Sequence, residues 1–246
     1  MPTITDTITT PDGECAVTLA TPEGSGPWPG VVMYPDAGGR RPAFGEMAEK
    51  LAGYGYAVLV PDLYYRSGDW APFDITTAFG DPDERARLMS MMGGITPDIM
   101  ASDAAAFFDY LASRPEVSGS AFGTTGYCMG GRTSLVVAGR VPERVAAAMS
   151  FHGGGLASDD PGSPHLLADK IRAAVFVAGA ENDASFTAES AETLDKALTA
   201  AGVEHTIETY PAAHGFAVSD HGAVYDADAA QRHWNAMESF FGAKLG

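Results

Sequence analysis

The sequence contains only two cysteines, Cys15 and Cys128, among its 246 residues. Two distant cysteines do not form the disulfide framework that stabilises small secreted proteins, so a hydrophobic core must hold this chain together. The first residues (Met-Pro-Thr-Ile-Thr-Asp) contain no basic region followed by an apolar stretch, so we expect no signal peptide. We therefore expect a cytoplasmic location, where the reducing environment would keep a chemically active thiol free.

Basic residues are also scarce, with 15 Lys and Arg against 32 Asp and Glu and a formal net charge of −17. Such a surface repels phosphate backbones, so a nucleic acid is not an expected partner. No apolar run approaches the roughly 20 residues of a membrane-spanning helix, so no membrane partner is expected either. The remaining expectation is a small-molecule substrate, bound by a monomer or a small homo-oligomer.

Apolar segments alternate along the chain between a strand pattern and a helix pattern. Residues 3–9 and 14–20 resemble an antiparallel strand pair joined by a turn at Pro11-Asp12-Gly13. Further short apolar runs predict strands at 30–34, 56–60, 121–127, 145–151, 174–179 and 203–209. Helices are predicted from about 42 to 53 and at 81–92, 97–113, 129–139, 187–201 and 224–241.

This order predicts the α/β fold class, with a mostly parallel central sheet and helices on both faces. A chain of this length fits one domain over residues 1–246, in which residues 64–95 contain a candidate lid segment. The chemistry of such sheets lies at the carboxyl ends of the strands, so candidate site residues are sought there.

A glycine-rich hexapeptide, Gly126-Tyr127-Cys128-Met129-Gly130-Gly131, lies between a predicted strand and a predicted helix. This is the nucleophile-elbow pattern, with Cys128 in the place of the usual serine. The glycines allow the strand and the helix to approach closely, and the helix N-terminus favours a thiolate. The alternative is a buried cysteine in a glycine-rich turn. The pattern favours Cys128 as a catalytic nucleophile.

Two later loops supply an acid and a base in the order that such enzymes use. Asp183 follows the strand predicted at 174–179, and His214 follows the strand at 203–209. His214 would accept the thiol proton, and Asp183 would fix the histidine tautomer. Glu181 is the alternative acid.

The other histidines are weaker candidates. His152 follows the strand at 145–151 and is predicted either to contact substrate or to be a structural histidine. His205 lies within a predicted strand, His165 has no expected role, and His221 and His233 are predicted to lie on the surface. No cluster of His, Cys and Asp has metal-ligand spacing, so neither a metal nor another cofactor is expected.

Together with the Pro61-Asp62-Leu63-Tyr64 segment and His214-Gly215-Phe216, the elbow resembles the dienelactone hydrolase family over residues 14–241. The resemblance implies a single-domain α/β-hydrolase with a Cys-His-Asp triad, no cofactor, and a lactone or ester as substrate. The namesake of the family opens an unsaturated lactone in the breakdown of chloroaromatic compounds.

Two positions depart from the family pattern. The family has a glutamate that contacts the cysteine at the end of the first buried strand, where this chain has Asp36. Aspartate is shorter by one methylene, and Asp36 is otherwise read as a loop residue that bonds nearby backbone amides. The family arginine four residues after the catalytic histidine is replaced by Val218. A second family arginine matches Arg85 or Arg87, which are otherwise exposed helix residues. These departures favour a less charged ester than the namesake lactone.

The expected reaction is hydrolysis through a thioester acyl-enzyme. The backbone N–H groups of Met129 and Ala37 are predicted to bind the oxyanion. Aromatic residues within 64–79 are expected either to line the pocket or to belong to the core. A broad carboxylesterase or thioesterase is a second hypothesis. A redox-reactive thiol on Cys128 and a non-catalytic binding module on the same fold are further alternatives from other classes.

Overall fold

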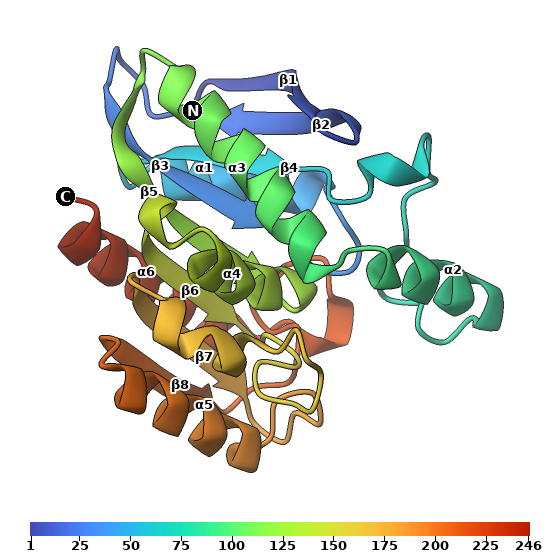
Figure 1. The fold of residues 1–246 in the computed structure, drawn as a ribbon. Coiled ribbons are helices and arrows are strands. Elements are labelled where there is room, and N and C mark those ends of the chain that lie inside the picture. The colour runs from blue at the N-terminus through green and yellow to red at the C-terminus, as the bar shows by residue number, and fades with distance from the viewer.

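A computed structural model describes all 246 residues, and Figure 1 shows one central sheet between two layers of helices. The sheet has eight strands in the order β1-β2-β4-β3-β5-β6-β7-β8. The strands are β1 (Thr3–Thr10), β2 (Gly13–Ala20), β3 (Trp28–Tyr34), β4 (Ala57–Pro61), β5 (Val117–Tyr127), β6 (Val145–Phe151), β7 (Ala174–Ala180) and β8 (His205–Tyr210). β1 pairs antiparallel with β2, and β2 with β4, whereas all pairs from β4 to β8 are parallel. The predicted α/β class is confirmed.

The helices are α1 (Pro42–Ala52), α2 (Pro82–Gly93), α3 (Pro97–Ser113), α4 (Met129–Arg140), α5 (Ala188–Ala201) and α6 (Ala227–Lys244). Two apolar cores result, one on each face of the sheet. One core joins the sheet to α3, α4 and α5, and the other joins it to α1 and α6. Neighbouring residues of a strand point to opposite faces, so Val31 of β3 packs in one core and Val32 in the other.

Capping residues set several of the helix ends. The Thr96 side chain accepts a hydrogen bond from the N–H of Ile99 and starts α3, which begins at Pro97 as predicted. α6 begins at Ala227 rather than at 224, because Asp226 caps it by accepting from the N–H of Ala229. Residues 222–224 form a separate 3-10 turn.

The segment between β4 and α3 leaves the main body. In Figure 1, α2 lies at the side of the molecule, away from the sheet, and of its residues only Leu88 is buried. Tyr64 and Phe73 are buried in the core, whereas Phe79 is 49% exposed. That this segment acts as a lid remains a prediction. None of the helices is both long enough and apolar enough to cross a membrane.

Candidate active site

Cys128 lies in the tight turn between β5 and α4. Its backbone has φ 53° and ψ −115°, a conformation that side-chain-bearing residues rarely adopt. The turn is held by its neighbours, since Cys128 N–H donates to Phe151 O at 3.1 Å and Gly131 N–H donates to Cys128 O at 3.0 Å. The thiol is partly exposed at the N-terminus of α4, where the helix dipole favours a negative sulfur.

The glycines of the elbow have no room for a side chain. A Cβ on Gly126 would overlap the carbonyl of Gly130, and a Cβ on Gly130 would overlap the backbone oxygens of Tyr34 and Pro35. These contacts bring the start of α4 against the end of β3. The N-terminus of α4, with the Cys128 thiol, is thereby placed beside the loop that follows β3.

Asp183 and His214 come together from the loops after β7 and β8. His214 Nδ1 lies 2.6 Å from Asp183 Oδ2, and Ser185 holds the other carboxylate oxygen by its backbone N–H at 2.8 Å and its hydroxyl at 2.6 Å. The Asp183 side chain is 4% exposed, whereas that of His214 is 32% exposed. Glu181, the alternative acid, is exposed, so the geometry favours Asp183.

Electrostatics fix the proton on His214. Burial lowers its pKa, but the hydrogen bonds to Asp183 and Cys128 and their negative charges raise it to about 10. Burial raises the pKa of Asp183, but the hydrogen bonds from His214 and Ser185 hold it below its ordinary value. The site therefore stabilises an ionised Asp183 beside a protonated imidazole.

The two N–H groups predicted for the oxyanion lie near Cys128. Met129 is the first residue of α4, so its N–H has no intrahelical acceptor. Ala37 N–H donates to no protein acceptor, while Ala37 O accepts from the Tyr64 hydroxyl at 2.8 Å. That hydroxyl also contacts Met129 Sδ at 3.7 Å. Tyr64 thus links the two segments.

Asp36 takes part in a buried ion network. Its carboxylate, 1% exposed, accepts from Arg41 at 2.6 and 2.9 Å, from Gly38 N–H at 2.8 Å and from His221 Nε2 at 2.8 Å. Burial raises its pKa, but the hydrogen bonds from His221 and Arg41 and the charge of Arg41 hold it well below the ordinary value. Arg41 also pairs with Asp220, so the network ties the loop after β3 to the loop after His214.

Replacing Asp36 with alanine is expected to cost about 3–5 kcal/mol of unfolding free energy, because it leaves the buried Arg41 charge with a poorer partner. Asp220→Ala is the matched control, since its carboxylate is 39% exposed and should contribute below about 1 kcal/mol. Urea denaturation measures both. Because folding lowers the pKa of Asp36, its ionised carboxylate adds to the free energy of unfolding at any pH above its pKa in the unfolded chain. This stabilisation is lost as the pH falls through the pKa of Asp36 in the folded protein. Equal losses in the two variants would contradict this account.

His152 packs against His214 in the interior. It is fully buried at φ 39°, lines neither of the cavities that reach Cys128, and packs its ring 5.1 Å from that of His214 and 5.0 Å from Phe216. This placement does not favour the predicted contact with substrate, which remains a prediction. Neither ring nitrogen has a hydrogen-bond partner within the protein. Burial and the nearby His214 charge keep its pKa well below the ordinary value.

Two histidines predicted on the surface are inside the molecule. His233 is fully buried on α6, where it contacts the Tyr127 hydroxyl at 2.8 Å and burial lowers its pKa to about 3. His221 is bound to Asp36 and its side chain is only 10% exposed. The acidic composition of residues 219–229 suggested a solvated surface, but partners distant in sequence decide where these rings lie. Arg85 is exposed on α2 and lines neither cavity at Cys128.

Two cavities meet at Cys128, and both are lined by Cys128, His214 and Phe79. The larger, about 940 Å³, extends between α2, α3 and α4, and also contains Asp183 and Arg132. The smaller, about 430 Å³, extends toward Asp36 and the loop after His214. The sequence analysis did not identify Arg132 as a site residue. Its position on α4, one helical turn after Cys128, places it on the same side of the helix as the thiol and could have indicated it.

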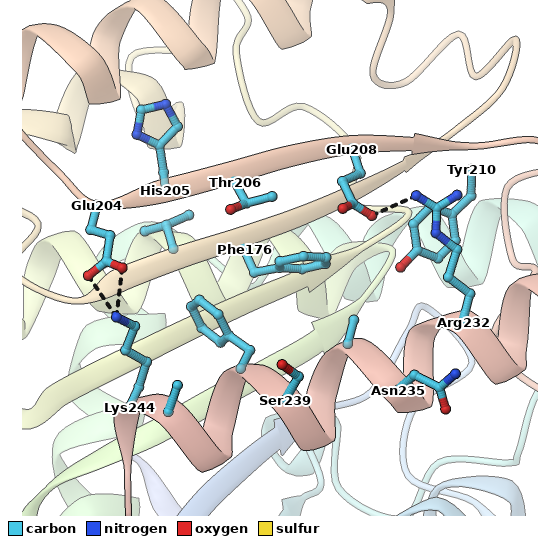
Figure 2. Close-up of a pocket in the computed structure, with 14 residues that line it drawn as sticks. Phe176, Glu204, His205, Thr206, Glu208, Tyr210, Arg232, Asn235, Ser239 and Lys244 are labelled. Carbon is cyan, nitrogen blue, oxygen red and sulfur yellow. Dashed lines mark hydrogen bonds and ion pairs between the residues drawn. The ribbon is translucent and has the colours of Figure 1, made fainter.

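A further hollow lies between β8 and α6, away from the elbow (Figure 2). Its charged residues are already paired, with Lys244 on Glu204 at 2.7 Å and Arg232 on Glu208 at 2.9 Å. It contains no residue of the Cys128 site, so it is not the candidate active site.

The sheet order and the strained elbow at its carboxyl edge define the α/β-hydrolase class. The dienelactone hydrolase family model matches residues 15–245. The chain belongs to the dienelactone hydrolase family, and it is a hydrolase of that type.

Relatives agree with this assignment. A Synechocystis protein provisionally named a carboxymethylenebutenolidase is 28% identical over 92% of this chain and 91% of its own length. The solved structure of a dienelactone-hydrolase-like promiscuous phosphotriesterase, P91, from metagenomic libraries is 29% identical, covers all of both chains and has a TM-score of 0.82. A provisionally named dienelactone hydrolase from Klebsiella pneumoniae is 25% identical, covers 98% of this chain and 99% of its own, and also has a TM-score of 0.82.

Proposed function

We propose that the protein hydrolyses a carboxylic ester or lactone through a thioester acyl-enzyme on Cys128. The observation that carries the proposal is the 2.6 Å contact of Asp183 with His214, together with the two cavities that Cys128 and His214 line in common. The same arrangement of acid, histidine and nucleophile serves acyl transfer on unrelated folds.

In the first half of the reaction, the Cys128 thiolate attacks the carbonyl carbon and the C=O electron pair moves to the oxygen. Met129 N–H and Ala37 N–H bind that oxyanion. The intermediate collapses as the bond to the leaving oxygen breaks, and the His214 imidazolium gives its proton to the departing alkoxide. A thioester on Cys128 and a free alcohol result.

In the second half, neutral His214 removes a proton from water, and the resulting hydroxide attacks the thioester carbonyl. The carbon–sulfur bond then breaks, which releases the carboxylic acid and restores the thiolate beside protonated His214. Asp183 remains ionised throughout and holds the imidazole orientation. Because a thiolate leaves the tetrahedral intermediate more readily than an amine does, amides should revert to reactants while esters, thioesters and lactones go forward.

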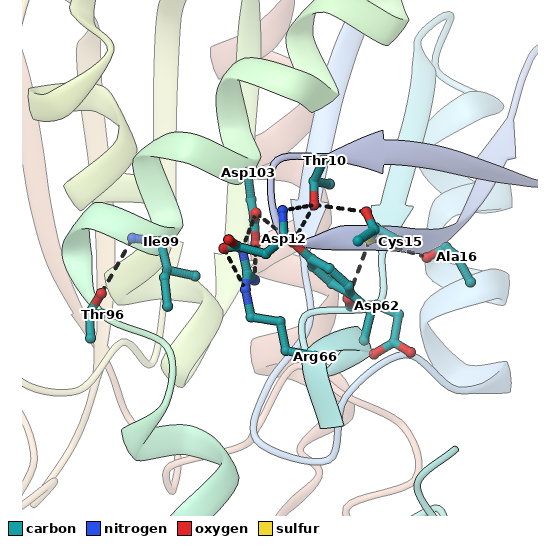
Figure 3. Close-up of polar contacts among 11 residues, drawn as sticks. Thr10, Asp12, Cys15, Ala16, Asp62, Arg66, Thr96, Ile99 and Asp103 are labelled. Carbon is teal, nitrogen blue, oxygen red and sulfur yellow. Dashed lines mark hydrogen bonds and ion pairs between the residues drawn. The ribbon is translucent and has the colours of Figure 1, made fainter. Parts of the chain in front are cut away.

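Trapping the acyl-enzyme tests this proposal. Rapid quench during turnover of p-nitrophenyl acetate should give a transient mass increase of one acetyl group, and peptide mapping should place that group on Cys128. Cys15 is an internal control, because it is fully buried and contacts the carbonyl oxygens of Asp62 and Ala16 (Figure 3). Burial and nearby carboxylates also raise its pKa to about 12.

Turnover without any adduct on Cys128, or acetylation of Cys15 at the same rate, would contradict the proposed nucleophile. If neither turnover nor an adduct is seen with p-nitrophenyl acetate or with a lactone, a redox-reactive thiol becomes the better reading of Cys128. Peroxide-dependent loss of the free Cys128 thiol would then be the next measurement.

A further inference from the structure

We infer that the larger cavity binds the hydrocarbon part of a neutral ester, so that the protein selects extended uncharged substrates over short or carboxylate-bearing ones. The inference rests on the proposed function of Cys128 and adds the substrate class. The inference concerns the part of the larger cavity that is formed by α2, the α2–α3 connection and α3. The elbow and the triad lie elsewhere in the cavity lining.

The wall of this cavity opposite the catalytic residues is apolar. Eight residues of the 79–100 segment line it, and all but Gly93 and Thr96 have apolar side chains: Phe79, Met89, Met92, Ile95, Pro97 and Met100. Phe79 is 49% exposed and Met89 is 51% exposed, so these two large apolar side chains of the wall are open to contact by a ligand. The volume of about 940 Å³ is that of a site for a drug-sized ligand. Unbranched methionines adapt to chains of different shape, so the wall suits flexible hydrocarbon.

The cavity offers a substrate carboxylate no unpaired cation, because the His214 imidazolium is already paired with Asp183 and Arg132 with Asp160. Arg132 is the one arginine or lysine among its lining residues, and its guanidinium donates to Gly155 O at 2.9 Å and Gly162 O at 3.2 Å. It also lies 3.3 Å from the carboxylate of Asp160, which lines the cavity too. A carboxylate brought into this space would meet Asp160 and Asp183 and lose its water without gaining a partner.

The arginines of α2 do not supply the missing cation. Arg85 is exposed outside both cavities, and Arg87, which also lines neither cavity, is paired with Glu84 at 2.7 Å. In the smaller cavity the charged groups are also satisfied, because Asp36 already binds Arg41 and His221. Of the two cavities that meet at Cys128, the larger has about twice the volume of the smaller and therefore more room for an extended group.

Two ester series measure the preference, one with the acyl chain lengthened from acetate to octanoate and one with the alcohol lengthened from methyl to octyl. In the series whose variable group enters the larger cavity, kcat/KM should rise about threefold for each added methylene until the cavity is filled. Phenyl hexanoate should also exceed its anionic counterpart of equal chain length, monophenyl adipate, by at least about tenfold.

Variants assign the effect to the cavity. Met92→Trp should remove the rise with chain length, because the larger ring fills the space that the added methylenes would occupy. Leu166→Trp is the matched control, since Leu166 is an exposed apolar residue outside both cavities. Met89→Asp, at a half-exposed position that should tolerate a charge, should flatten the same series if Met92→Trp does not fold.

Flat profiles in both series, equal effects of Met92→Trp and Leu166→Trp, or a preference for monophenyl adipate would each overturn the inference. These results are separable from failure of the proposed function. If Cys128 is acetylated but kcat/KM does not depend on chain length, only the inferred substrate class is wrong. If no ester forms an acyl-enzyme, the inferred substrate class and the proposed function are both wrong.

Discussion

Asp183→Asn is expected to lower kcat by about 10⁴-fold while the protein remains folded. Asp183 accepts a 2.6 Å hydrogen bond from His214 Nδ1, which leaves Nε2 as the nitrogen that serves the thiol. An amide can present its NH₂ group to Nδ1 instead, which selects the wrong tautomer, and it provides no charge to stabilise the imidazolium. Steady-state hydrolysis of p-nitrophenyl acetate and circular dichroism measure the two parts of this prediction.

The pH profile adds a second readout to the same variant. In the wild type, the pKa of His214 is raised to about 10, so the imidazolium needed to protonate the leaving group persists up to that pH. The asparagine variant loses the contributions of Asp183 to this raised pKa and keeps those of Cys128. Its alkaline limb in kcat/KM should therefore move from near pH 10 toward the ordinary histidine value of 6.5.

Glu181→Gln is the control, since Glu181 is the other carboxylate of the same loop and is exposed. It should change kcat by less than about twofold. A large loss in Glu181→Gln, or an alkaline limb that stays in place in Asp183→Asn, would mean that Asp183 is not the orienting acid.

Gly130→Ala is expected to cost at least about 4 kcal/mol of unfolding free energy, or to prevent folding altogether. The added methyl group would overlap the backbone oxygens of Tyr34 and Pro35. Backbone of a central strand cannot move aside as the end of a flexible side chain can, so the cost should exceed that of ordinary overpacking. Thermal and urea unfolding measure it.

Gly45→Ala is the matched control because it makes the same substitution within α1. Apart from the backbone of its own helical turn, no atom lies within 4 Å of the position its Cβ would take. Alanine is a better helix former than glycine, so this variant should gain about 0.5–1 kcal/mol. The two substitutions should therefore have opposite signs. Similar stability of the two proteins would show that α4 can move away from β3 without cost.

The α/β class, the elbow at Cys128 and the loops that carry Asp183 and His214 could be predicted from the order of the amino acids alone. Each of these depends on local patterns: short apolar runs, glycines at fixed spacing, and polar residues directly after predicted strands. Parallel strands align their carboxyl ends at one edge, so residues in three such loops had to approach one another. Their roles as nucleophile, acid and base remain a proposal that the acyl-enzyme and Asp183 experiments test.

The surroundings of these residues could not be predicted and follow from how the loops and helices pack. The sequence does not pair Asp36 with Arg41 and His221, bury His233 against Tyr127, or place His152 beside His214 outside both cavities. These outcomes depend on contacts between loops and helices as much as 185 residues apart, for which the chain carries no local signal. The apolar wall of the larger cavity has the same origin, because α2 buries little of its own surface and becomes a binding wall only through its position beside α3 and Cys128.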